Sequence, residues 1–394
     1  MTSFDSSPTL TVWRTLLALA VVFVMLATTG WTATHHHRTP GAREASLAAW
    51  GRGTVAGHQL PSPAASPSRL AHFFASLSTT QRTRLADRYP LVVGNLNGAP
   101  VTLRYHANRS ALEQARTVER RRLTDSTLSA DGHQDAVRTY DRYSALLQDG
   151  RQILAFDPAG TGRVAEVFGN LQRAQHISVV VPGVDTNLLT FQRAQRPYSA
   201  PVGMAKSLYA AEHTTSPGAH TAVIAWADFT SPVGVGVDAA IGRLAEDGAV
   251  RLHALVDALP GNAPVALICH SYGSVVCGVA AHDMSTRVSD IAVAGSPGMR
   301  TGSAAGLDTD ARVWAMRDSD DWIQDVPHLD VGGLGHGADP VSSGFGARVV
   351  SAGGAHGHAG YFEPGTESLS NFAAVGTGKF ASVSCADGRD SCHS

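Results

Sequence analysis

The feature that most constrains the fold is a series of short apolar runs that begins near residue 152. Longer segments with helical spacing, among them 237–259 and 273–284, separate these runs. Wholly apolar runs are typical of strands buried between two layers, and their alternation with helix-length segments indicates βαβ units and a parallel sheet. We therefore predict an α/β fold, with a mostly parallel central sheet flanked by helices, over residues 151–380. The runs are 153–156, 177–181, 221–226, 265–268, 291–294, 313–316 and 349–350.

Residues 69–150 carry a mixed pattern and are predicted to form an N-terminal helical and hairpin extension. A charged region with helical spacing covers 110–147. Residues 91–103 contain two apolar runs on either side of Asn97-Gly98, a pair that is typical of the turn in a β-hairpin. We expect a strand, a turn and a second strand there.

The N-terminal segment indicates the compartment. Residues 16–27 are apolar and uncharged, and Arg14 precedes them. Such a run at the N-terminus is typical of a signal peptide or a single membrane anchor, and we assign 1–33 to one of the two. We expect an extracytoplasmic protein, either secreted or held at a membrane by this segment. Residues 34–68 are rich in His, Pro, Ser, Gly and Ala and are predicted to be a disordered linker.

Charge and cysteine usage narrow the classes of partner. The formal net charge is −2 and no block of Lys or Arg stands out, so nucleic-acid binding is not expected. Cys385 and Cys392 lie in a short polar tail, 381–394, where we expect a disulfide in an oxidising compartment. Cys269 and Cys277 lie in an apolar stretch. Nothing in the pattern indicates an oligomeric state.

The most informative motif is the tetrapeptide His-Ser-Tyr-Gly at 270–273, between the run 265–268 and a helix of small residues. A nucleophilic serine on a sharp turn between strand and helix needs this order, and small residues must flank it because the backbones approach closely. Gly273 satisfies the second position after the serine, whereas Cys269 stands two positions before it, where Gly is usual. Ser271 is the predicted nucleophile, and the alternative is an ordinary Ser-Gly turn.

A serine hydroxyl needs a histidine to accept its proton and a carboxylate to orient that histidine. The chain order for such a triad in this fold is nucleophile, acid, base. The acid is expected after a late strand, where Asp321 is preferred and Asp320 and Asp318 are alternatives. The base is expected after the last strand. His358 is preferred to His356 because two small residues and Tyr-Phe follow it, a pattern expected in related proteins.

Backbone N–H groups are expected to stabilise the oxyanion. The candidates are Tyr272, directly after the nucleophile, and Val184, which follows an apolar run and Pro182-Gly183. The Gly-rich apolar segment 233–237 is expected near the substrate entrance. Because no H-E-x-x-H or C-x-x-C spacing is found, neither a catalytic metal nor another cofactor is expected.

Several of these stretches together resemble an α/β-hydrolase family that is widespread in actinobacteria and was long classed as a domain of unknown function. The resemblance covers roughly 70–365 and leaves out the N-terminal segment and the tail. It implies a triad of Ser271, Asp321 and His358, and Cys269 departs from the family's common pattern. The stretches are 88–100, 107–109, 155–162, 181–183 and 270–273.

The expected activity is hydrolysis of an ester through an acyl-enzyme, and the resemblance suggests the same reaction without naming a substrate. The substrate is expected to be a small-molecule or lipid ester. An acyltransferase or a peptidase on the same fold would use the same triad. The remaining alternative is a non-catalytic envelope protein.

Overall fold

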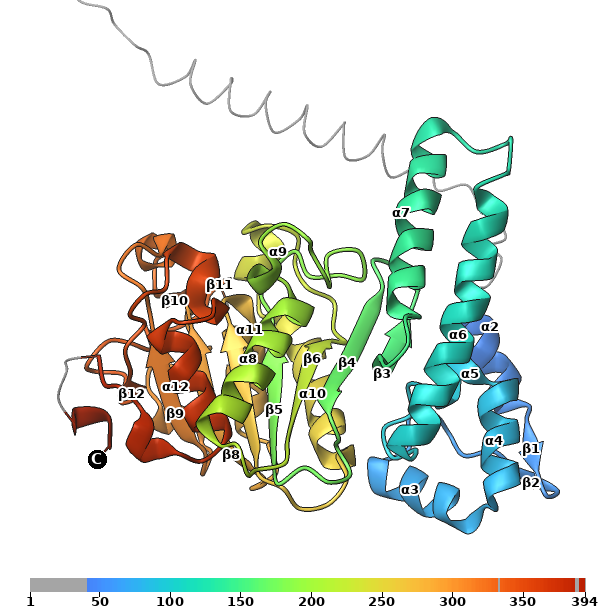
Figure 1. Ribbon diagram of the computed structural model, residues 1–394, viewed down its shortest axis with the longest axis horizontal. Coiled ribbons are helices and arrows are strands. Elements are labelled where there is room, and N and C mark those ends of the chain that lie inside the picture. The colour runs from blue at the N-terminus through green and yellow to red at the C-terminus, as the bar shows by residue number, and fades with distance from the viewer. Residues whose placement is uncertain (1–40, 332–333, 387–389, 394) are drawn as a thin grey trace, which may run out of the picture. The chain divides into compact units, whose positions relative to one another are not determined.

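The structure is a computed structural model that describes residues 41–331, 334–386 and 390–393. Residues 42–394 form one compact unit (Figure 1). The helices are α2 (Ala42–Gly51), α3 (Pro67–Ser76), α4 (Thr79–Arg88), α5 (Pro90–Val93), α6 (Val101–Arg122), α7 (Ala130–Leu146), α8 (Pro201–Thr215), α9 (Val237–Ala240), α10 (Arg243–Ala258), α11 (Tyr272–Ala281) and α12 (Glu367–Gly376). The strands are β1 (Thr54–Val55), β2 (His58–Gln59), β3 (Gln152–Asp157), β4 (Arg163–Gly169), β5 (His176–Val181), β6 (Thr221–Ala227), β7 (Val265–His270), β8 (Val288–Ala294), β9 (Arg312–Met316), β10 (Asp330–Val331), β11 (Leu334–Gly335) and β12 (Arg348–Val349).

The central sheet has eight strands in the order β12-β9-β8-β7-β5-β6-β4-β3. The strands from β12 to β6 in this order run parallel to one another. β4 runs antiparallel to both of its neighbours, β6 and β3. The predicted α/β fold with a mostly parallel sheet is confirmed.

The apolar runs do not predict β4, because charged residues interrupt its sequence. Arg163 begins the strand, and Glu166 lies near its middle with a side chain that is almost completely buried. Arg151 Nε donates to Glu166 Oε1 at 2.7 Å, so the buried carboxylate has a charged partner. A strand that contains a buried ion pair lacks the continuous apolar run by which its neighbours are recognised.

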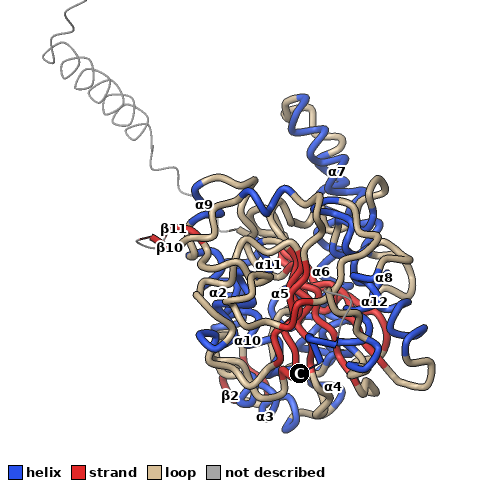
Figure 2. The backbone as a smooth tube through the Cα atoms, turned by 90° about the vertical axis from the view of Figure 1, so that its left-hand side faces the viewer, coloured by secondary structure: helices blue, strands red, loops and turns tan. Residues whose placement is uncertain are grey.

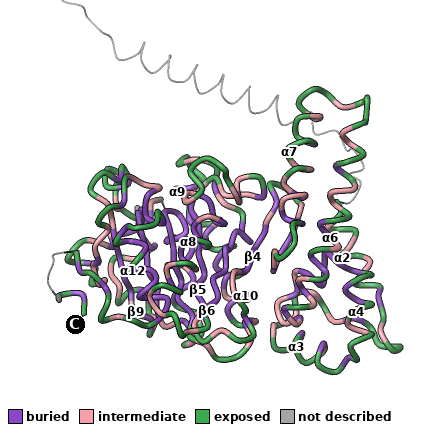
Figure 3. Tube along the Cα trace, viewed as in Figure 1, coloured by how far each residue is buried: buried purple, intermediate pink, exposed green. Residues whose placement is uncertain are grey.

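Helices cover both faces of the sheet, so alternate residues of a strand enter different cores. In β5, Val180 packs in one core with Leu208 of α8, whereas Val179 packs in the other with Leu252 of α10. Figure 2 shows the strands as a twisted layer between these helices, and Figure 3 shows that the central strands are the most completely buried part of the unit. The carboxyl ends of the parallel strands meet at one edge, where ligands bind in open α/β sheets.

The hairpin predicted at 91–103 is wrong, because this segment forms α5 and the start of α6. The apolar residues 91–93 are all buried. Val92 and Val93 lie in a separate core of the N-terminal helices, and Leu91 lies in one of the cores of the sheet, so the apolar pattern reflects burial and not a strand. Gly98 does make a tight turn, with φ +109, and a Cβ there would lie 2.2 Å from the Pro67 carbonyl oxygen. The turn joins two helices instead of two strands.

The disordered linker predicted at 34–68 is wrong for the part that the structure describes. Residues 42–68 form α2, the β1–β2 hairpin and the start of α3. Trp50 is fully buried, contacts the Tyr89 ring at a centroid distance of 5.4 Å and donates its indole N–H to the Pro61 carbonyl at 2.7 Å. The amino-acid composition of this segment does not reveal that it packs around a buried tryptophan.

The predicted signal peptide or anchor, 1–33, lies outside the described residues. Within the described part of the chain, no helix combines the length and the apolar character that crossing a membrane requires.

Candidate active site

Ser271 lies on the turn between β7 and α11, at the carboxyl end of the strand. Its backbone has φ 54 and ψ −127, a conformation that residues with a Cβ rarely adopt. Gly273 permits the tight approach of the following helix, since a Cβ there would lie 2.1 Å from the Val181 carbonyl oxygen. The strained turn is the geometry expected of a nucleophile elbow.

The structure brings the three predicted triad residues together in one hydrogen-bonded chain. His358 Nε2 lies 2.8 Å from Ser271 Oγ. His358 Nδ1 lies 2.8 Å from Asp321 Oδ1 and 3.0 Å from Oδ2. Because an ionised carboxylate only accepts, Nδ1 carries the proton, and Nε2 is then free to accept the Ser271 hydroxyl proton. Serine and histidine are 87 residues apart in the chain, so this contact exists only in the folded protein.

The alternative acids and base lie outside this chain of hydrogen bonds. Asp318 Oδ2 accepts from the Gly357 backbone N–H at 2.7 Å and so ties the loop of the acid to the loop of the base. Asp320 and His356 are exposed. The geometry therefore favours Asp321 and His358 among the candidates.

Asp321 is fully buried and accepts several hydrogen bonds. The Tyr361 hydroxyl donates to Oδ2 at 2.5 Å, and the Ile323 backbone N–H donates to Oδ1 at 3.0 Å. Burial opposes ionisation, but the hydrogen bonds from His358, Tyr361 and Ile323 outweigh it and lower the pKa of the Asp321 carboxyl below its ordinary value. The sequence predicts Asp321 but gives Tyr361 no role, because the residues are 40 positions apart.

His270, directly before the nucleophile, supports the loop of the base. Its Nε2 lies 2.7 Å from the His358 backbone carbonyl oxygen, to which it donates. Burial and the neighbouring His358 lower the pKa of the His270 imidazole to about 3, so this ring stays neutral. The sequence motif contains His270 without indicating this contact.

The predicted oxyanion donors flank the nucleophile. Gly183 abuts the serine so closely that a Cβ on it would lie 2.7 Å from Ser271 Cβ, which places Val184 beside the turn. Val184 and Tyr272 both line cavities that also contain Ser271. In the part of the chain that the structure describes, no acceptor takes a hydrogen bond from the backbone N–H of either residue. Both N–H groups are thus available to a bound oxygen.

Residues 157–331 match the family described as "Alpha/beta hydrolase". The chain has the α/β-hydrolase fold. The match contains β7, the Ser271 turn and Asp321, whereas His358 lies beyond it.

Two relatives of this chain are uncharacterized proteins of Mycobacterium tuberculosis, one from strain CDC 1551 / Oshkosh and one from strain ATCC 25618 / H37Rv. Each is 29% identical over 381 residues, and the alignment covers 81% of this chain and 57% of the relative. The chain therefore spans little more than half the length of these relatives.

Two solved structures are similar in part. Dienelactone hydrolase from Anabaena variabilis is 16% identical with a TM-score of 0.34, over 59% of this chain and 98% of that one. Est1E from Butyrivibrio proteoclasticus is 13% identical with a TM-score of 0.35, over 58% of this chain and 100% of that one.

A disulfide spans the turn that carries Ser271. Cys269, at the end of β7, is bonded to Cys277 in α11, and both residues are fully buried. The unusual cysteine two positions before Ser271 thus has a structural partner that the sequence does not indicate. Cys385 and Cys392 are also bonded, as predicted for the tail. Among the described residues, the cluster of potential metal ligands is Cys385, Cys392 and His393, and its sulfurs are held in this disulfide.

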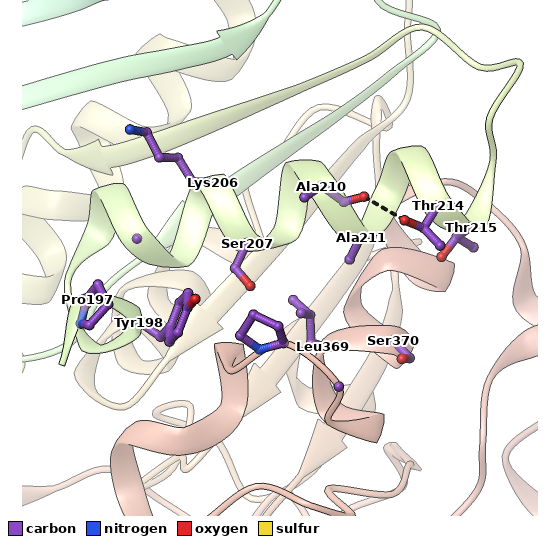
Figure 4. Close-up of a pocket in the computed structure, with 13 residues that line it drawn as sticks. Pro197, Tyr198, Lys206, Ser207, Ala210, Ala211, Thr214, Thr215, Leu369 and Ser370 are labelled. Atoms are coloured by element: carbon purple, nitrogen blue, oxygen red, sulfur yellow. Dashed lines mark hydrogen bonds between the residues drawn. The ribbon is translucent and has the colours of Figure 1, made fainter.

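A groove of about 610 Å³ lies between α8 and the start of α12 (Figure 4). It shares no lining residue with the cavities at Ser271. Ser207 lines it, but no histidine or carboxylate does, so this serine has no histidine–carboxylate pair in the groove. Among the described residues, the hydrogen-bonded serine, histidine and carboxylate lie at the β7–α11 turn and not in this groove.

Proposed function

We propose that the protein is a serine hydrolase that cleaves an ester through a covalent acyl-enzyme. The observation that carries the proposal is the hydrogen-bonded chain from Ser271 through His358 to Asp321, with the serine on a strained strand–helix turn. A serine hydroxyl with an adjacent base, itself oriented by a buried carboxylate, is the arrangement that activates a serine for acyl transfer.

In the first half of the reaction, Ser271 Oγ attacks the ester carbonyl carbon while His358 Nε2 accepts the hydroxyl proton. The carbonyl oxygen becomes an oxyanion, and the backbone N–H groups of Tyr272 and Val184 donate to it. The carbonyl then re-forms, the bond to the alcohol oxygen breaks, and His358 gives its proton to the leaving alcohol.

In the second half, a water molecule attacks the acyl-enzyme carbonyl and His358 accepts a proton from it. The bond to Ser271 Oγ breaks, the proton returns to the serine, and a carboxylic acid is released. Asp321 stays ionised and stabilises the imidazolium that forms in each half. His270 and Tyr361 are positioning residues, since one holds the His358 loop and the other holds Asp321.

We place the protein outside the cytoplasm. The four cysteines form two disulfides, which persist in oxidising compartments. The apolar N-terminal run 16–27 gives independent support for export or anchoring.

Hydrolysis of p-nitrophenyl acetate by the purified protein tests the reaction. We expect Ser271→Ala, His358→Ala and Asp321→Asn each to lower kcat by at least about 10³-fold. His356→Ala and Asp320→Asn are matched controls at exposed neighbouring positions and should leave kcat unchanged. Equal activity of Ser271→Ala and the unaltered protein would overturn the proposal. Product that appears only when a second alcohol or amine is added would indicate an acyltransferase instead.

A further inference from the structure

Ser271 lies between two cavities that differ in polarity. One has a volume of about 480 Å³ and the other about 160 Å³. Ser271 and Val184 line both, so the nucleophile and a predicted oxyanion donor stand at their junction. An ester carbonyl held at Ser271 would therefore direct its two substituents into different surroundings.

The larger cavity is apolar. The segments 235–240 and 322–329 supply most of its lining, and among the described residues the polar side chains that line it are Ser271, Tyr272 and His336. Its volume falls within the range of about 300–1,000 Å³ that is typical of small-molecule pockets. The apolar lining residues are Val184, Val235, Ala239, Ala240, Pro297, Trp322, Ile323, Val326, Pro327 and Leu329.

Apolar side chains continue from this cavity onto the surface. Val235 is 71% exposed, Leu329 57% and Trp322 45%. Val233 and Val237, on either side of Val235, are also exposed. A ligand too long for the cavity would thus remain against apolar side chains where it emerges.

The smaller cavity is more polar than the larger one and contains the base. His358 lines this cavity and not the larger one. Thr186, Thr190, Arg193 and Ser199 contribute hydroxyl and guanidinium groups to its lining. The group that gives the leaving alcohol its proton therefore faces this cavity.

We propose that the substrate is an ester of an aliphatic acid, with its acyl chain in the apolar cavity and a small polar alcohol in the cavity beside His358. This assignment rests on the proposed function. Its physical basis is that the leaving oxygen must lie within reach of His358, which puts the alcohol on the polar side and leaves the apolar side for the acyl chain. Burying the chain removes apolar surface from water and strengthens binding with each methylene.

The first test measures kcat/KM of the full chain for p-nitrophenyl esters of two to twelve acyl carbons, below their micellar concentrations. Each methylene that enters the cavity should raise kcat/KM by about fourfold until the cavity is filled. A profile that is flat or falls beyond acetate, with hydrolysis still dependent on Ser271, would overturn the assignment and leave the proposed function standing. No Ser271-dependent hydrolysis of any ester would overturn both.

Two variants separate the cavities. Ala240→Phe narrows the apolar cavity and should lower the ratio of kcat/KM for the eight-carbon ester to kcat/KM for acetate by at least about tenfold. Ser199→Leu is the matched change in the polar cavity. It should keep the acyl-length profile and instead lower the activity toward glycerol esters relative to ethyl esters of the same acid. Cooperative thermal unfolding followed by circular dichroism shows that each variant is folded, and a chain-length change caused by Ser199→Leu alone would reverse the assignment.

Discussion

Asp321 shows how neighbouring groups set the charge of a single carboxyl. It is fully buried, which by itself favours the neutral acid, yet three donors hold it ionised. Tyr361 contributes the shortest of these hydrogen bonds, at 2.5 Å, and accepts in turn from the Asp318 backbone N–H at 3.0 Å. One phenolic hydroxyl therefore links the acid to the backbone of its own loop.

We expect Tyr361→Phe to lower kcat by about tenfold or more, because a hydrogen bond to a charged group is worth about 1.5–3 kcal/mol. KM should change little, since Tyr361 lines neither cavity at Ser271. Steady-state kinetics on a short ester measures both constants. An unchanged kcat would show that the remaining donors suffice to hold Asp321.

Glu212 is a buried carboxyl far from the triad in the sequence. Its Oε1 accepts from the Ser178 hydroxyl at 2.5 Å, and Oε2 has no hydrogen-bond partner among the described residues. Burial raises the pKa of the Glu212 carboxyl to about 8, whereas an unfolded chain ionises near its ordinary value of 4.5. Between these values the folded state binds more protons, so the contribution of Glu212 to stability falls as pH rises from about 4.5 to about 8.

Glu212→Gln removes this titration. The free energy of unfolding of the unaltered protein should fall relative to that of the variant by up to about 1.4 kcal/mol per pH unit between pH 5 and 8. Urea unfolding at several pH values measures the difference. Parallel pH curves for the two proteins would contradict a buried, protonated Glu212.

At the scale of elements, the junction of β7 and α11 is fixed by close packing and by a covalent bond. Gly273 allows α11 to approach the end of β5, and Cys269–Cys277 joins the strand to the helix on either side of Ser271. The tail disulfide, Cys385–Cys392, closes a loop of similar length, 7 residues against 8, away from the nucleophile.

Replacing Cys269 and Cys277 by Ala should lower the free energy of unfolding by about 2–3 kcal/mol, as expected for a loop of this length. Because the bond spans the strained turn, kcat should fall as well. Replacing Cys385 and Cys392 by Ser is the control and should leave kcat unchanged. Equal effects of the two changes on kcat would show that the first disulfide does not hold the elbow.

Elements differ in how well the sequence predicts them. The strands from β5 to β9 follow from their apolar runs, because each is buried on both faces. β4 does not, because its buried Glu166 is paired with Arg151 from outside the strand. The helices at 91–103 are predicted as a hairpin because local turn chemistry cannot show which elements a turn joins.

In the site, the order of the motifs along the chain predicts Ser271, Asp321 and His358. The hydrogen bond from Tyr361 is not predicted, because it depends on contacts between distant segments.

At the scale of the whole molecule, residues 42–394 form a unit separate from the first 41 residues. The catalytic groups and both cavities belong to this unit. A chain that begins at Ala42, with both disulfides formed, should therefore hydrolyse p-nitrophenyl acetate with the kcat of the full chain and unfold at the same temperature. Loss of cooperative unfolding on removal of residues 1–41 would show that the segment contributes to the fold.

The N-terminal segment 1–33 leads to a prediction of where the protein is found in a cell. If 1–33 directs export, the full chain should appear in the membrane or secreted fraction of a bacterial host, with its cysteines oxidised. The chain that begins at Ala42 should remain in the cytoplasm with reduced cysteines. Thiol labelling of each fraction distinguishes these states, and a cytoplasmic, reduced full chain would contradict export.

The central claim is that Ser271 is an activated nucleophile, and labelling with a fluorophosphonate probe tests it most directly. The folded full chain should gain one phosphonyl group, peptide mapping should place that group on Ser271, and Ser271→Ala should abolish it. Failure of the folded protein to react, or labelling that persists in Ser271→Ala, would contradict the account.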